Sequence, residues 1–124
     1  MRVSDMERLW AWFANRMKDP PASPKLKVTL SGLSAWGRYT LWPTPTVTVK
    51  PWATRQVVIH EYSHHYQQQR ADRPTVQGFP AAVGEPSWTR RAAEAFAESL
   101  TRILLAKPRT KADRWLLPLL KRGV

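Results

Sequence analysis

The residues His60, Glu61 and His64 form a His-Glu-x-x-His sequence, which directly follows the apolar run 57–59. On an α-helix, residues i and i+4 project from the same face, about 6 Å apart along the axis. That separation lets two imidazole rings reach one zinc ion, because each Zn–N bond is about 2.0–2.1 Å long. Glu61 then lies beside the metal, where its carboxylate can take a proton from a water molecule. The spacing therefore predicts a zinc site that hydrolyses an amide bond.

A catalytic zinc site usually has three protein ligands and one open position. The neighbouring His65 points about 100° away from His64 on a helix, and the chain has no fourth histidine. A carboxylate is therefore expected as the third ligand, and Glu94 on a second helix is the best placed. Glu98, one turn further on, is expected to accept the ring N–H of a ligand histidine and fix its orientation. The reverse assignment, with Glu98 as the ligand, stays open, as does simple pairing of both carboxylates with Arg90, Arg91 or Arg102.

The elements that must position these residues follow from the hydrophobic pattern. An amphipathic helix is predicted from Ser4, which with Glu7 forms a capping box, to a stop at the prolines 20–21. Alternating segments at 25–30, 37–42 and 46–50 predict a small antiparallel or mixed sheet. The metal-binding helix is expected over 53–69 and a loop that lines the cleft over 70–86. A Glu-bearing helix capped by Ser87 should run to 106, and a last helix capped by Thr110 should be bent or shortened by Pro118. The expected fold class is α+β.

Length and composition limit the possible classes of protein. The chain has 124 residues, enough for one domain (1–124) with a modest core, and it contains no cysteine. A disulfide framework, a Cys-ligated zinc and a thiol nucleophile are thereby excluded. The first residues lack the apolar stretch of a signal peptide, and no segment approaches transmembrane length. We expect a cytoplasmic protein with no membrane partner.

The chain is strongly basic, with 20 Lys and Arg against nine Asp and Glu and a net charge of +11. Such a charge favours polyanionic partners, and the seven tryptophans offer surfaces for base stacking. The basic residues are scattered, however, and no continuous basic helix face or nucleic-acid motif is present. Nucleic acid is therefore a candidate partner, beside a protein or peptide substrate.

The two histidines of the motif, with Glu94 and Glu98 four residues apart on a later helix, resemble the gluzincin metallopeptidases. In size the chain is most similar to the minimal single-domain members, called minigluzincins, and to compact metallopeptidase domains of phage and bacterial proteins. The resemblance covers roughly residues 46–105. It implies a small zincin-like domain in which an edge strand, 46–50 or 39–42 here, holds an extended peptide.

The resemblance also implies Zn²⁺ as the cofactor, Glu61 as the general base and a narrow range of substrates. Larger gluzincins stabilise the oxyanion from a second lobe, which this chain lacks. The candidates for that role are Tyr39, Tyr66, Trp88 and Arg90, and the sequence selects none of them.

Three functions stay open. The first is a metallopeptidase acting on a specific protein, and the second is a protease recruited to nucleic acid. SprT-like enzymes of the second kind use a third histidine after the motif, which neither Gln68 nor Arg70 supplies. The third is a zinc-stabilised module that binds nucleic acid or protein without turnover. A chance occurrence of the motif on an exposed polar helix is the simplest alternative to all three.

Overall fold

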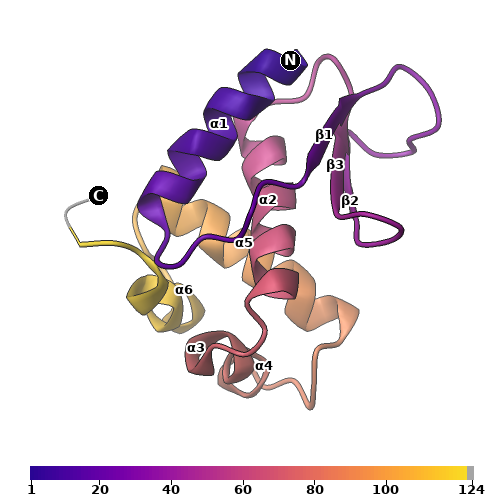
Figure 1. Cartoon of the computed structure of the whole chain (residues 1–124). Helices are drawn as coiled ribbons and strands as arrows, with labels where there is room; N and C mark the ends of the chain where they lie inside the picture. Colours follow the sequence, from indigo (N-terminus) through magenta and orange to yellow (C-terminus); the bar gives the residue numbers. More distant parts are fainter. Residues whose placement is uncertain (123–124) are drawn as a thin grey trace.

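Helix α2 (Arg55–Gln69) carries the His-Glu-x-x-His residues and has the other elements packed around it (Figure 1). The computed structural model describes residues 1–122, and within them six helices and a three-stranded mixed sheet form a compact fold. The α+β class is therefore confirmed. Residues 123 and 124 of the expected domain lie outside the described residues.

Most sides of α2 are buried, as the apolar run before the motif predicts. Ile59, Tyr62 and Tyr66 are fully buried in the single apolar core cluster. The Tyr62 hydroxyl donates a hydrogen bond to the Met6 carbonyl (2.6 Å), and the Tyr66 hydroxyl donates one to the Lys18 carbonyl (2.8 Å). These bonds satisfy the polar ends of two buried rings and fix α2 against the N-terminal part of the chain.

Helix α1 (Val3–Arg16) is amphipathic and buries Met6 and Phe13 against α2. It begins one residue before Ser4, so the expected capping box of Ser4 and Glu7 is wrong. The Asp5 carboxylate instead accepts a hydrogen bond from the Arg2 backbone N–H at 2.9 Å. An acidic side chain in the first turn caps the helix as well as Ser4 would, because it also complements the helix dipole.

The sheet has the strand order β1-β3-β2, in which β3 (Thr46–Val49) is central. Strand β1 (Lys25–Val28) pairs with β3 in parallel, and β2 (Gly37–Thr40) pairs with β3 in antiparallel orientation. The expectation that 46–50 forms an edge strand is therefore wrong, because β3 is paired on both sides. The edge strand that packs on α2 is β2, which ends at Thr40 rather than Trp42.

The segment 70–86 contains two short helices, α3 (Pro74–Gln77) and α4 (Phe79–Ala82). Its buried side chains Val76 and Phe79 belong to the core, and both helices contact α6 (Lys111–Leu116). The prediction of a loop that lines the cleft is therefore wrong. Proline at the start of a helix lacks an N–H that would be unpaired there anyway, so Pro74 and Pro80 begin helical turns instead of preventing them.

Helix α5 (Arg90–Leu105) begins after Thr89, whose hydroxyl accepts a hydrogen bond from the Ala92 N–H, so the predicted cap at Ser87 is two residues early. The predicted cap of α6 at Thr110 is confirmed, since its hydroxyl accepts from the Asp113 N–H. Asp113 is fully buried and accepts a 2.7 Å hydrogen bond from the Arg102 guanidinium, which joins α6 to α5. Pro118 lies in the short 3-10 turn that follows (Leu117–Leu119).

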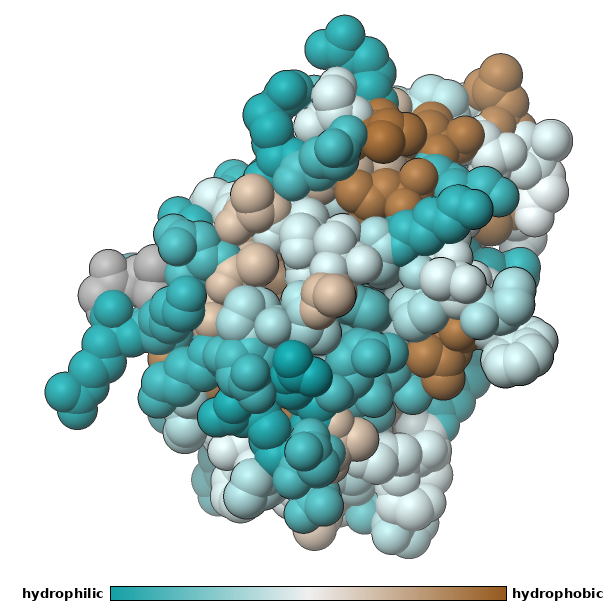
Figure 2. Space-filling view, in the orientation of Figure 1, coloured by the Kyte–Doolittle hydropathy of each residue, from teal (hydrophilic) through white to brown (hydrophobic). Residues whose placement is uncertain are grey.

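Exposed apolar side chains gather over one part of the surface. Figure 2 shows brown residues mainly at the upper right, where Figure 1 draws the sheet, and a mostly teal surface elsewhere on this face. Five of the nine large apolar side chains that are exposed within residues 1–122 lie between positions 30 and 52: Leu30, Trp36, Leu41, Trp42 and Trp52. None of the helices in the same range is both long and apolar enough to cross a lipid bilayer.

Candidate metal centre

The two motif histidines lie on one face of α2. Thr54 caps this helix by accepting a hydrogen bond from the Val57 N–H (3.3 Å), which sets the helical register just before the motif. The rings of His60 and His64 are 4.9 Å apart between centroids and meet edge to face. The predicted i, i+4 arrangement of the rings on one face is therefore present.

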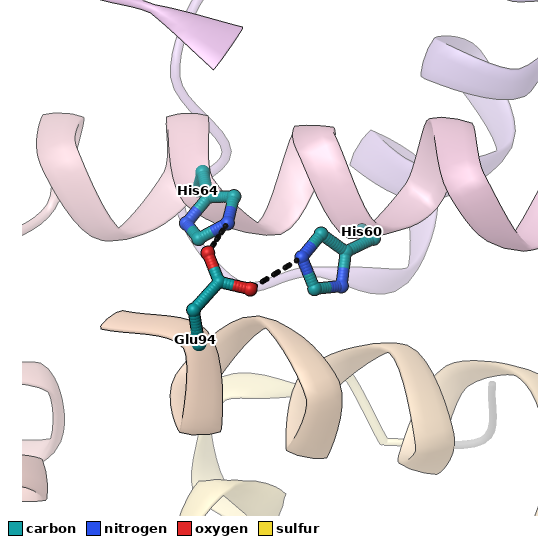
Figure 3. Close-up of side chains that lie close together, drawn as sticks. All are labelled: His60, His64 and Glu94. Atoms are coloured by element: carbon teal, nitrogen blue, oxygen red, sulfur yellow. Dashed lines mark hydrogen bonds and ion pairs between the residues drawn. The ribbon is translucent and has the colours of Figure 1, made fainter. Parts of the chain in front are cut away.

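Glu94 reaches these rings from α5. Helix α5 packs against α2, and the residues around Glu94 on α5 include the small, buried Ala92 and Ala97. Nε2 of His60 lies 3.2 Å from Oε2 of Glu94, and Nε2 of His64 lies 3.1 Å from Oε1 (Figure 3). One donor atom from each of the three side chains falls within 4.8 Å of the others, so the group can hold a metal ion.

The distances within this group fit the coordination of a small ion. Two ligand atoms bonded to one tetrahedral zinc at about 2.0–2.1 Å stand roughly 3.3 Å apart. The separations from Glu94 to the two rings, 3.2 Å from Oε2 to His60 and 3.1 Å from Oε1 to His64, are close to that spacing, and each ends on a different carboxylate oxygen. Burial and the neighbouring His60 lower the pKa of His64, although the charge of Glu94 opposes this shift. The lowered pKa favours the neutral imidazole that metal binding requires.

Glu61 lies outside the metal-binding group but next to it. Its side chain is 9% exposed and packs between α2 and β2. Burial and, to a smaller extent, the charge of Glu94 raise its pKa to about 7, although a hydrogen bond from the Tyr39 backbone N–H opposes the shift. A carboxyl group whose pKa lies near neutrality can both accept and release a proton.

A cavity of about 570 Å³ joins Glu61 to the metal-binding group. Its walls come from α2, the start of α5, strand β2 and the segment before it. Two of the lining side chains, Arg38 and Arg90, are cationic, and the only acidic ones are Glu61 and Glu94. The full lining consists of Leu33, Ser34, Ala35, Gly37, Arg38, Tyr39, His60, Glu61, His64, Gln67, Gln68, Arg90, Ala93 and Glu94.

His65 faces away from the metal-binding group, as its position on the helix predicts. Its Nε2 lies 2.8 Å from the Ala22 carbonyl, so this nitrogen carries the proton and donates it. Its Nδ1 then accepts a hydrogen bond from the Tyr39 hydroxyl at 2.9 Å. His65 therefore ties α2 to β2 and to the segment before β1.

The remaining predicted residues are placed as follows. Glu98 is exposed and shares a second cavity with His60, and within residues 1–122 no hydrogen bond joins Glu98 to either motif histidine. Its orienting role stays a prediction. Of the four oxyanion candidates, Tyr66 points to the Lys18 carbonyl and Trp88 packs on Phe79 and Phe96. Tyr39 and Arg90 line the cavity, and the Tyr39 hydroxyl is already bonded to His65.

The sequence predicted 39–42 as one of two strands that could border the site, but the close approach of Gly37 to α2 was missed. A Cβ atom on Gly37 would lie 2.8 Å from Cγ1 of Val57 and 3.2 Å from Cγ of Glu61, so only glycine fits there without movement. The segment 33–35, which forms one wall of the cavity, was also missed. The signal was the glycine at the start of an alternating strand, which marks a close approach of another element.

Comparison with known proteins gives no relative: no protein-family model, no curated protein and no solved structure matches this chain. The chemistry assigned to the site therefore depends on the side chains and distances described above.

Proposed function

We propose that this chain is a zinc-dependent metallopeptidase of the gluzincin type, with zinc held by His60, His64 and Glu94 and with Glu61 as the general base. The observation that carries the proposal is the position of Glu61. It is a buried carboxylate in the wall of the same cavity, adjacent to the group that can hold a metal and not part of it. A purely structural metal site has no need of such a group.

The donor set favours zinc. Two imidazoles and one carboxylate are the ligands of a familiar class of catalytic zinc sites, which keep a fourth position open. The group also faces a cavity, so water and a substrate can reach that position. Calcium and magnesium prefer oxygen ligands and would be held poorly by two ring nitrogens.

The residues around the cavity have the properties that amide hydrolysis requires. When bound, zinc supplies a Lewis acid that polarises the scissile carbonyl group. A carboxylate oxygen of Glu61 takes the proton of the attacking water and passes it to the leaving amine. Arg90 is the cationic oxyanion candidate that lines the cavity, and its guanidinium can stabilise negative charge on the carbonyl oxygen.

The unpaired edge of β2 borders the same cavity, through Gly37, Arg38 and Tyr39. An extended peptide can add to that edge by backbone hydrogen bonds, which positions its carbonyl near the metal. Arg38 and Arg90 favour substrates that carry acidic side chains next to the scissile bond. The proposed substrate is therefore an extended peptide segment with acidic residues, which agrees with a narrow range.

The test is the zinc content and hydrolytic activity of the wild type and three carboxylate variants. We expect one zinc per chain in the wild type, loss of zinc in Glu94→Ala, and retention of zinc without turnover in Glu61→Gln. Glu98→Ala is the matched control on the same helix; an orienting role predicts a drop of about 10- to 100-fold in zinc affinity. Loss of zinc in Glu98→Ala with retention in Glu94→Ala would reverse the ligand assignment. A folded wild type that takes up no zinc would refute the proposal.

The same experiment separates the enzyme from a zinc-stabilised binding module. Peptides that contain Asp and Glu, and a generic protein such as casein, serve as substrates. If the wild type binds zinc, cleaves none of them, and matches Glu61→Gln in stability and binding, the structural role of the metal is preferred.

A further inference from the structure

The outer face of the sheet is open, because the helices α1 and α2 pack on the opposite face. The strand register places the outward side chains in two rows. Each row runs across all three strands and takes one residue from each strand. The first row contains one lysine and two threonines, and the second contains one lysine, one threonine and one arginine. The rows are Lys25, Thr46 and Thr40, followed by Lys27, Thr48 and Arg38.

This face is free of negative charge. The chain has no acidic residue between Asp19 and Glu61, a stretch that includes the whole sheet. Glu61 itself is buried on the inner side of β2, away from the outer face. The cationic side chains of the three strands therefore have no acidic partner within the sheet itself, which favours an anionic ligand on this face.

Exposed tryptophans lie beyond both ends of the strands. Trp42 follows β2 and is 86% exposed; together with Lys25 and Lys27 it lines a hollow of about 250 Å³. At the other end Trp36 precedes β2, and Trp52 follows β3 with Lys50 near its ring; both tryptophans are about half exposed. An exposed tryptophan ring offers a flat face on which a base can stack.

We propose that the outer face of the sheet binds single-stranded nucleic acid, with phosphates held by Lys25, Lys27 and Arg38 and a base stacked on Trp42. Sequence-tolerant binding of single strands needs two components: cationic side chains along the phosphate backbone of the nucleic acid, and an aromatic ring on which a base can stack. The two lysines with Arg38 supply the first component, and Trp42 supplies the second. A duplex offers no free base to stack on Trp42. The proposal does not depend on the metal or on peptide hydrolysis.

The arrangement favours this partner over an anionic membrane. A membrane-binding surface gathers its apolar side chains on one protruding region that inserts into the lipid. Here the exposed apolar side chains lie in the turns beyond both ends of the strands, and polar threonines fill the sheet between them. Threonine hydroxyls can donate hydrogen bonds to phosphate oxygens along that path.

The test is fluorescence anisotropy of labelled single strands of DNA and of RNA, each of about 15 nucleotides, against full-length protein at several salt concentrations. We expect affinity to fall with added salt, with a slope near −2 for three phosphate contacts. Lys25→Gln/Lys27→Gln should reduce that slope by about 1.4. The matched control Lys107→Gln/Lys111→Gln removes the same charge from exposed positions elsewhere and should leave most of the affinity intact.

Trp42 separates stacking from bulk charge. Trp42→Ala should weaken binding about 5- to 100-fold at constant salt, and Trp42→Phe should restore much of it. Thermal unfolding of each variant checks that the fold is retained.

Four results would overturn the proposal. They are no binding of either strand at low salt, equal losses in the two double-lysine variants, duplex bound as tightly as single strands, and no effect of Trp42→Ala. Vesicles with anionic lipid that bind in a Trp42-dependent way, while neither strand does, would assign the face to a membrane instead.

Discussion

Gly37→Ala tests the contact between β2 and α2 on which the position of Glu61 depends. Gly37 does not have the positive φ that favours glycine, so backbone strain is not the issue. The problem is space: the new Cβ would lie 2.8 Å from Cγ1 of Val57, whereas ordinary contact begins at 3.4 Å. Strand and helix must separate by roughly 0.6 Å or repack.

The expected cost follows from two opposing effects. Overpacking of this kind costs about 1–3 kcal/mol, and the smaller entropy of the unfolded chain with alanine offsets about 0.4–1 kcal/mol. We therefore expect a net loss of about 1–2 kcal/mol in the free energy of unfolding. Glu61 must also move, since its Cγ would be 3.2 Å from the new atom. Because a shift of about 1 Å can cost 100-fold in rate, turnover should fall about 10- to 100-fold while zinc is retained.

The assay is a double-mutant cycle with Val57→Ala, measured by urea unfolding with tryptophan fluorescence. Val57→Ala removes the methyl group that the new Cβ meets, so Gly37→Ala should cost much less in that background. The expected coupling is about 1 kcal/mol. A coupling below about 0.3 kcal/mol, which is within additivity, would show that Val57 does not restrict Gly37 and would refute the reasoning.

The remaining predictions concern other contacts. His65→Ala should lose about 2–3 kcal/mol of stability yet retain zinc, because its ring bonds to Ala22 and Tyr39; zinc loss would contradict the assigned orientation. Asp113→Asn should lose about 2–3 kcal/mol in urea unfolding at neutral pH. Burial raises the pKa of Asp113, but hydrogen bonds, led by the one from Arg102, outweigh burial and hold this pKa below its ordinary value of 3.8. The ionised Asp113 side chain therefore stabilises the fold fully above about pH 4, and this stabilisation is lost as the pH falls. The free energy of unfolding of Asp113→Asn should accordingly fall less steeply in acid than that of the wild type. Arg90→Gln should lower kcat about 100-fold on acidic peptides with unchanged zinc content; an unchanged kcat would remove Arg90 from the oxyanion role.

Local signals in the sequence predicted the types of element better than their arrangement. The helical spacing of α2 and α5 and the alternation of the strands depend on the near neighbours of each residue, and these elements are present. The strand order depends on pairing between distant segments, which periodicity does not encode. The sequence therefore does not decide between 46–50 and 39–42 as the edge strand, and the structure makes β3 central and β2 an edge. The helices in 70–86 were missed because Pro74 and Pro80 were interpreted as breakers instead of helix starts.

The candidate site was predictable where helix geometry or elimination decided it. The i, i+4 spacing placed His60 and His64 on one face, and the small number of possible ligands left Glu94 or Glu98. The structure brings Glu94 within 3.2 Å of both rings. The wall formed by β2 was not predictable, because the contact of Gly37 with Glu61 joins elements that are far apart in the sequence. The same limit applies to Arg90, whose position in the cavity depends on how α5 packs on α2.

Strand β2 contributes to both proposed functions because alternate residues of a strand face opposite sides of a sheet. Gly37 and Tyr39 face α2, where they contact Glu61 and His65, while Arg38 lies opposite Thr48 on the outer row. Arg38 also lines the cavity, so it is the residue that both surfaces share. Variants of Trp42 or Lys25 should therefore alter nucleic-acid binding without loss of zinc, and Glu94→Ala should do the reverse. Only a change at Arg38 should affect both nucleic-acid binding and the cleavage of acidic peptides, and that pattern would place the two surfaces on one continuous path across the edge of the sheet.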